Sequence, residues 1–156
     1  MSGLVVLGAQ ESGVGAALLA KKLGMPVFVS DAGTIKDSYR AELLANDIAY
    51  EEGGHTAATV LAADEVVKSP GIPDTAALVR AAIERGTPVI SEIEFASRHT
   101  RSTIVGITGA NGKTTTTLLT GHILRKAGMD VGVGGNVGHS FARLIASTEL
   151  PPRGMK

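Results

Sequence analysis

The sequence contains no cysteine and no tryptophan, and aromatic residues make up only 3% of its 156 positions. Without cysteine, neither a disulfide framework nor a thiolate zinc site can form, which fits a reducing compartment. Fifteen basic and fifteen acidic residues cancel to a formal net charge of zero. Bulk electrostatics therefore gives no sign of a nucleic-acid partner or of an acidic membrane surface.

Long apolar runs are also missing. No stretch approaches the about 20 apolar residues that would cross a bilayer. The N-terminal stretch MSGLVVLGAQESG lacks a basic segment followed by a long apolar one, so we expect no signal peptide. From these features we expect a cytoplasmic protein that does not insert into membranes.

Short β-branched runs alternate with longer helical patterns, which is typical of an α/β fold with a mostly parallel sheet. Small and aliphatic residues dominate the apolar positions, as in strands that are buried on both faces. The predicted strands are 4–7, 27–31, 48–50, 65–68 and 89–91. A glycine-rich turn over 8–15 leads into a helix that ends at Gly24, and further helices are predicted at 38–45, 57–62, 74–85 and 92–99.

The pattern starts again after residue 100, with strands at 103–107 and 131–133 and helices at 112–127 and 140–147. The helix at 112–127 carries an apolar stripe of Leu119, Ile123 and Ala127. We therefore expect two units: a Rossmann-like domain over 1–97, and over 98–156 the beginning of a P-loop ATPase-type α/β domain. The second unit is too short to be complete, so we expect the chain to be a piece of a longer protein.

The stretch GITGANGKTTTT, residues 106–117, lies between an expected strand and an expected helix. The N–H groups and the dipole at a helix N-terminus attract anions. Gly109 and Gly112 would let the backbone approach a phosphate chain, Lys113 adds a charge, and Thr114 offers a hydroxyl to Mg²⁺. Ile107 stands where the general P-loop pattern has its first glycine. A strand–turn–helix connection with an incidental lysine is the alternative interpretation.

Gly8–Gly15 also follows an expected strand, and Asp31 ends the next one, as in dinucleotide-binding folds. The spacing is not G-x-G-x-x-G, so a diphosphate other than that of NAD fits as well. The turn Ser69–Pro73 allows close approach of a ligand at Gly71, or it is an ordinary turn. Asn136 either donates an amide to a ligand or is a left-handed turn residue.

Other polar residues give weaker signals. The four histidines show no metal-ligand spacing, and we expect them at the surface or satisfied by neighbours. Glu92 and Glu94 are expected to be exposed carboxylates at a helix start.

The string GITGANGKTTT resembles the nucleotide loop of the Mur ligase superfamily, the ATP-dependent amide-forming enzymes of peptidoglycan synthesis and their folylpolyglutamate synthase relatives. Three further stretches add to the resemblance: KSPGIP (68–73), ISEIEF (90–95) and VGVGGNVG (131–138). The resemblance covers residues 3–147 and does not include the tail TELPPRGMK. Within the superfamily, these stretches look most like the ligases that add D-glutamate.

The resemblance implies a ligase that joins D-glutamate to UDP-N-acetylmuramoyl-L-alanine through an acyl phosphate, using ATP and Mg²⁺. It implies catalytic roles for Lys113 and Thr114, with Thr114 also holding the metal. The implied ATP contacts are Gly109, Ala110, Asn111, Gly112, Lys113, Thr114 and Thr115, and the implied UDP-sugar contacts are Ser12, Gly13, Asp31, Ser69, Gly71 and Asn136.

This fragment alone is expected to be inactive, because the remaining metal ligands and the amino-acid site would lie beyond residue 156. Two alternatives stay open. One is a module that binds a UDP-sugar or a dinucleotide without catalysis. The other is a different Mur ligase or a folylpolyglutamate synthase relative.

Overall fold

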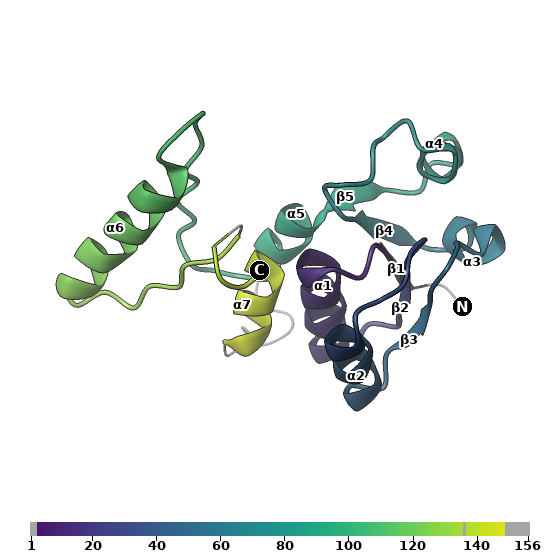
Figure 1. Ribbon diagram of the computed structural model, residues 1–156, viewed down its shortest axis with the longest axis horizontal. Coiled ribbons are helices and arrows are strands. Elements are labelled where there is room, and N and C mark those ends of the chain that lie inside the picture. The colour runs from purple at the N-terminus through teal and green to yellow at the C-terminus, as the bar shows by residue number, and fades with distance from the viewer. Residues whose placement is uncertain (1–2, 136, 149–156) are drawn as a thin grey trace.

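A computed structural model describes residues 3–135 and 137–148 (Figure 1). Its centre is a five-stranded parallel sheet with the strand order β3-β2-β1-β4-β5. The strands are β1 (Leu4–Leu7), β2 (Val27–Ser30), β3 (Ala49–Glu51), β4 (Glu65–Lys68) and β5 (Val89–Ser91). The α/β fold with a parallel N-terminal sheet that the sequence predicts is thus confirmed.

Two layers of helices cover the sheet. Val5 and Leu7 of β1 pack into one core with α3 (Ala57–Leu61) and α4 (Ala77–Glu84). Leu4 and Val6 pack into the other with α1 (Glu11–Lys22), α2 (Asp37–Ala45) and α5 (Glu92–Ser97). Successive side chains of a strand point to opposite faces, so a short aliphatic run such as LVVL feeds both cores at once.

Helix α1 begins earlier than the sequence predicts, because Gly13 and Gly15 lie inside it rather than in the preceding turn. A Cβ at Gly13 would lie 1.8 Å from the carbonyl oxygen of Gly8, and one at Gly15 would lie 2.1 Å from Ser140 Oγ. These glycines therefore serve close packing of the helix, whereas the turn itself requires Gly8, whose φ is +92°.

Helix α7 (Phe141–Ser147) returns from the second predicted unit to the first and packs against α1 and α5 (Figure 1). Its Ala142 and Ile145 are buried in the same core as Val6. The Ser140 side chain caps it by accepting a hydrogen bond from Arg143 N. Residues on both sides of the expected boundary near 97 therefore share one hydrophobic core.

Helix α6 (Lys113–Lys126) stands apart from these layers (Figure 1). The strands predicted at 103–107 and 131–133 are wrong, since neither segment forms regular structure. A strand needs the ladder of a neighbour, and neither segment is paired with another among the described residues. The apolar stripe predicted on α6 is not covered here: Leu119 and Ile123 are both 56% exposed.

None of the helices described, over 3–135 and 137–148, combines the length and apolar character needed to cross a membrane.

Candidate functional site

The carboxyl ends of β1 and β4 lie side by side at the centre of the sheet. From β1 the chain proceeds to β2 on one side, and from β4 it proceeds to β5 on the other. Such a reversal of strand order is where open α/β sheets bind ligands. Gly8 follows β1 and Ser69 follows β4, and a Cβ at Gly8 would lie 2.5 Å from Ser69 Oγ. The two predicted loops thus meet at this switch point.

Ser69 carries the only buried side-chain polar atom without a hydrogen-bond partner in the described part of the chain, its Oγ. The turn around it is well fixed. Ile72 N donates to Ser69 O at 3.0 Å, and Lys68 Nζ donates to Ile72 O at 2.9 Å. A hydroxyl that is buried and unpaired costs free energy unless a partner is supplied. The switch point therefore offers an unsatisfied donor and acceptor.

The first turn of α1 faces the same edge of the sheet. Its first backbone hydrogen bond runs from Val14 N to Gln10 O, at 2.9 Å. The preceding N–H groups, those of Ser12 and Gly13 among them, point beyond the helix end, where the helix dipole favours negative charge. This geometry suits a diphosphate, as the sequence predicts for these two residues.

Asp31 closes the site at the end of β2. Its Oδ2 accepts a hydrogen bond from Ala9 N at 2.5 Å, and its Oδ1 accepts one from Gly33 N at 2.8 Å. The carboxylate therefore ties the β1–α1 loop to the loop after β2. A ligand that contacts Asp31 must use the lone pairs that these two bonds leave.

Next to Asp31 in the chain, Ser30 belongs to a cluster of polar side chains that also includes Glu51, His55 and Thr56. Ser30 Oγ donates to Glu51 Oε1 at 2.6 Å and also lies 2.6 Å from His55 Nδ1. Thr56 N donates to the same Glu51 oxygen at 2.8 Å. Burial raises the pKa of Glu51, but the hydrogen bonds from Ser30 and Thr56 outweigh it and the pKa is lowered. Through its contact with Ser30, His55 has a hydrogen-bond partner, as expected for a histidine satisfied by its neighbours.

The second glycine-rich loop precedes α6. Gly109 has φ +150° and Gly112, the N-cap of α6, has φ +75°, and both are conformations that favour glycine. Lys113 is the first helical residue, and its Nζ donates back to the carbonyl oxygens of Gly109 and Ala110. The ammonium group therefore lies against the carbonyl oxygens of the loop, while the Lys113 side chain as a whole is exposed.

The remaining predicted residues of this loop, Asn111, Thr114 and Thr115, are exposed. Thr117 lies one turn further on and donates its hydroxyl to Lys113 O at 2.8 Å, so it serves the helix backbone. The loop offers backbone N–H groups, one ammonium and hydroxyl oxygens, and this donor set fits a phosphate chain with Mg²⁺. Gly71 lies in the turn after β4, whereas Asn136 lies outside the described residues.

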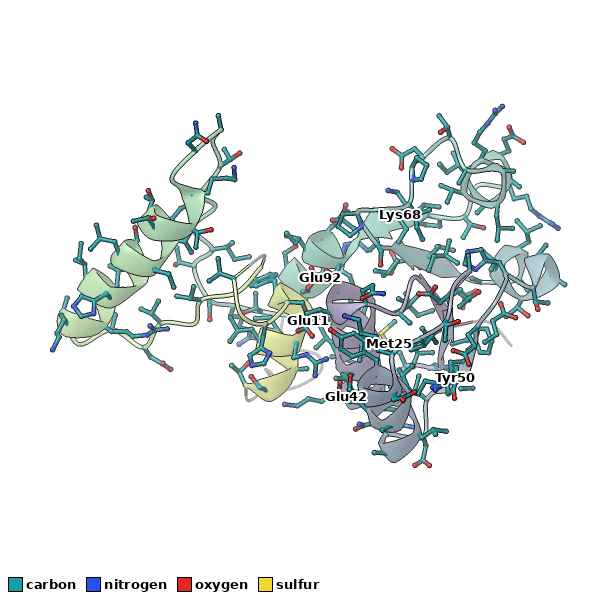
Figure 2. All side chains as sticks on the ribbon, in the orientation of Figure 1. Glu11, Met25, Glu42, Tyr50, Lys68 and Glu92 are labelled. Atoms are coloured by element: carbon teal, nitrogen blue, oxygen red, sulfur yellow. The ribbon has the colours of Figure 1, made fainter. Side chains whose placement is uncertain are left out.

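No sequence pattern indicated that carboxylates from other helices contact the start of α7. Glu92 was expected to be exposed but is only 5% exposed, and its Oε1 accepts a hydrogen bond from Ala142 N. Glu11 Oε1 accepts one from Ser140 N at 3.0 Å (Figure 2). Arg143 pairs with Glu11 and with Glu42 of α2. No local pattern signals these contacts, because α7 is distant in sequence from all three glutamates.

Comparison with known proteins identifies relatives of this chain. Residues 2–77 match the family model of the MurD N-terminal domain. A UDP-N-acetylmuramoylalanine–D-glutamate ligase from Porphyromonas gingivalis is 58% identical over 148 residues, which are 95% of this chain and 33% of that protein. The ligase of the same name from Bacteroides fragilis is 56% identical over 146 residues, covering 94% of this chain and 33% of that protein.

Among solved structures, a murein peptide ligase from Psychrobacter arcticus superposes with a TM-score of 0.60 at 29% identity, over 81% of this chain and 27% of that one. The sheet, its switch-point loops and these similarities make the chain a member of the Mur ligase superfamily. Within it, the chain is similar to MurD over nearly its whole length. It spans about a third of the length of the curated relatives that it matches.

Proposed function

We propose that this chain is part of an ATP-dependent ligase that adds D-glutamate to UDP-N-acetylmuramoyl-L-alanine in peptidoglycan synthesis. The names of the relatives support the substrate and the reaction. The observation that carries the proposal is the unpaired Ser69 hydroxyl beside Gly8, at the switch point of a nucleotide-binding type of sheet. Because ATP and a UDP-sugar are its substrates, we propose that the reaction takes place in the cytoplasm.

Residues 1–97 form the UDP-sugar-binding domain in this proposal. Ser12 and Gly13 bind the diphosphate at the first turn of α1, and Asp31 faces the uridine. Ser69 and Gly71 contact the sugar nucleotide from the β4 side. Asn136 adds an amide from the glycine-rich stretch 131–138.

Residues 98–156 begin the ATP-binding domain. The backbone of residues 109–112 and the side chain of Thr115 hold the phosphates, and Lys113 neutralises charge that develops on the transferred phosphoryl group. Thr114 would hold Mg²⁺, which supplies further neutralisation of the phosphate oxygens when bound. The carboxylate of UDP-N-acetylmuramoyl-L-alanine would take the γ-phosphoryl group of ATP to become an acyl phosphate, with ADP as the leaving group. The amino group of D-glutamate would then attack the acyl carbon, forming the amide and releasing inorganic phosphate and a proton. The chain alone is expected to be inactive.

A thermal-shift measurement on this chain tests the binding part of the proposal. A ligand present at about 100 times its Kd stabilises the folded state by about 2.7 kcal/mol. We expect UDP-N-acetylmuramoyl-L-alanine to raise the Tm and NAD to leave it unchanged. A rise with NAD alone would support a dinucleotide-binding module, and a rise with neither would refute the proposed site.

A further inference from the structure

Glu11 joins two segments that are far apart in sequence. Its Oε1 accepts hydrogen bonds from Ser140 N at 3.0 Å and from Arg143 Nε at 2.8 Å, across 129 and 132 positions (Figure 2). Its Oε2 lies 3.4 Å from the Tyr39 hydroxyl. The carboxylate is therefore held from three directions.

The two joined segments are both candidate ligand-binding segments. Glu11 is the first residue of α1, directly before Ser12 and Gly13, so its backbone belongs to the turn that faces the sheet edge. Ser140 is the N-cap of α7 and lies two positions after the glycine-rich stretch 131–138. Between the two, Gly135 N of that stretch donates to His139 O at 2.9 Å. One carboxylate thus sets the position of one loop relative to the other.

The junction is charged and tightly packed. Burial raises the pKa of Glu11, but the Ser140 N–H and Arg143 outweigh this effect, so the pKa is lowered and the carboxylate is ionised at neutral pH. Arg143 is itself fixed by Glu42, whose Oε2 accepts from Nη2 at 2.9 Å. At Gly15, a Cβ would lie 3.1 Å from Arg143 N, which leaves little room for α7 to slide along α1.

We propose that Glu11 is a positioning residue that combines the β1–α1 loop and the segment 137–140 into one binding surface for the sugar nucleotide. The diphosphate lies at the loop, and the muramoyl-peptide side of the molecule reaches the segment before α7. This inference rests on the proposed function. It assigns to Glu11 the geometry between the two parts of the ligand and no direct contact with it.

A positioning role of Glu11 can be distinguished from a general effect on stability by comparing a short ligand with a longer one. Isothermal titration calorimetry would compare UDP with UDP-N-acetylmuramoyl-L-alanine for the unchanged chain, Glu11→Ala and Glu11→Gln. We expect Glu11→Ala to weaken the sugar nucleotide about tenfold and UDP less than about twofold, because UDP needs only the first loop. Glu11→Gln keeps an oxygen that accepts from Ser140 N and should restore most of the affinity.

Glu42→Gln is the matched control. It removes charge from the other partner of Arg143 and leaves the hydrogen bond between Glu11 and Ser140 in place, so binding of both ligands should change less than about twofold. Equal loss of both ligands in Glu11→Ala, or no loss of either, would overturn the positioning role.

A readout without ligand keeps this inference separate from the proposed function. Hydrogen exchange at the Ser140 amide should become faster in Glu11→Ala than in Glu42→Gln, while amides inside α1 keep their protection. If the unchanged chain binds neither ligand, the proposed function fails. Unchanged exchange at Ser140 would instead show that Glu11 does not hold the segment, whatever the chain binds.

Discussion

Glu92 is a carboxyl group whose ionised form is disfavoured by its buried position in the fold. It is the first residue of α5 and is 5% exposed, and its carboxylate accepts the Ala142 N–H of α7 (Figure 2). Burial raises its pKa, Glu11 raises it further, and the Ala142 hydrogen bond only partly offsets these effects. The group is retained as the acceptor for an N–H in the first turn of α7, which would otherwise be buried without a partner.

Replacement of Glu92 should separate the hydrogen bond from the charge. With a folded-state pKa above the unfolded value, its contribution to stability is fully present below the unfolded pKa and is lost as the pH rises through the folded pKa. We expect Glu92→Gln to gain free energy of unfolding, relative to the unchanged chain, as the pH rises from about 4 to about 8. Glu92→Ala should lose about 1–3 kcal/mol, because Ala142 N is left unpaired.

Urea unfolding at several pH values measures both effects. Glu11 and Glu51 have lowered pKa values, so their contributions are lost as the pH falls. Glu51 titrates in both proteins and cancels in the difference, whereas Glu11 is coupled to the charge of Glu92, and its lowered pKa confines its own titration to the acid end of the range. A Gln variant that tracks the unchanged chain at every pH would contradict the burial argument.

Gly13 shows a second residue-scale constraint, one of space. A Cβ there would meet the backbone oxygen of Gly8 at 1.8 Å, so Gly13→Ala must displace the loop or the helix. We expect a loss of about 1–3 kcal/mol in the free energy of unfolding, the usual cost of overpacking. Gly54→Ala is the control, since a Cβ there has no atom within 4 Å, and it should change stability by less than about 0.5 kcal/mol.

At the scale of elements, the sequence predicted the strands and helix ends that are determined by neighbouring residues in the chain. The run Leu4–Leu7, bounded by Gly8, specifies a buried strand without reference to the rest of the chain, and the same is true of helix ends such as Gly24 and Gly86. The strand predicted at 103–107 failed because pairing is a property of two segments. The burial of Glu92 was missed because the helix that covers it lies about 50 positions away.

Docking of α7 can be tested through its buried side chain. Ile145 is 6% exposed in the core that it shares with α1, so Ile145→Ala should cost about 2–4 kcal/mol in the free energy of unfolding. Leu119→Ala on α6 removes a similar side chain that is 56% exposed and should cost less than about 0.5 kcal/mol. Equal losses in urea unfolding of the two variants would mean that α7 does not belong to the N-terminal core.

At the scale of the molecule, the two candidate sites lie on parts of the fold that are packed to different degrees. The switch-point loops rest on a sheet covered on both faces, and their positions follow from the strand order β3-β2-β1-β4-β5. The loop before α6 rests on a helix whose apolar stripe is largely exposed. The position of each glycine-rich stretch between an expected strand and an expected helix located both loops, although neither has the standard glycine spacing. The link between the first loop and α7 through Glu11 and Arg143 required the folded chain.

This separation predicts that the two sites respond independently to mutation. Among the described residues, the Lys113 side chain makes its hydrogen bonds within its own loop, to Gly109 O and Ala110 O, and this loop is distant in sequence from β1 and β4. In the full-length protein, Lys113→Ala should lower ATP turnover by about 10²–10³-fold, because an ammonium that neutralises developing charge is lost. Binding of UDP-N-acetylmuramoyl-L-alanine should stay within about twofold, because sites that share no contact partners respond additively to mutation.

Lys126→Ala, at the other end of α6, removes an equal charge and should leave both quantities unchanged. A coupled assay of phosphate release would measure ATP turnover, and calorimetry would measure binding of the sugar nucleotide. If turnover survived the loss of Lys113, the 109–115 loop would not hold the transferred phosphate. If sugar-nucleotide binding fell with turnover, the two loops would be one coupled site, and the independence argued from the separate packing of α6 would be wrong.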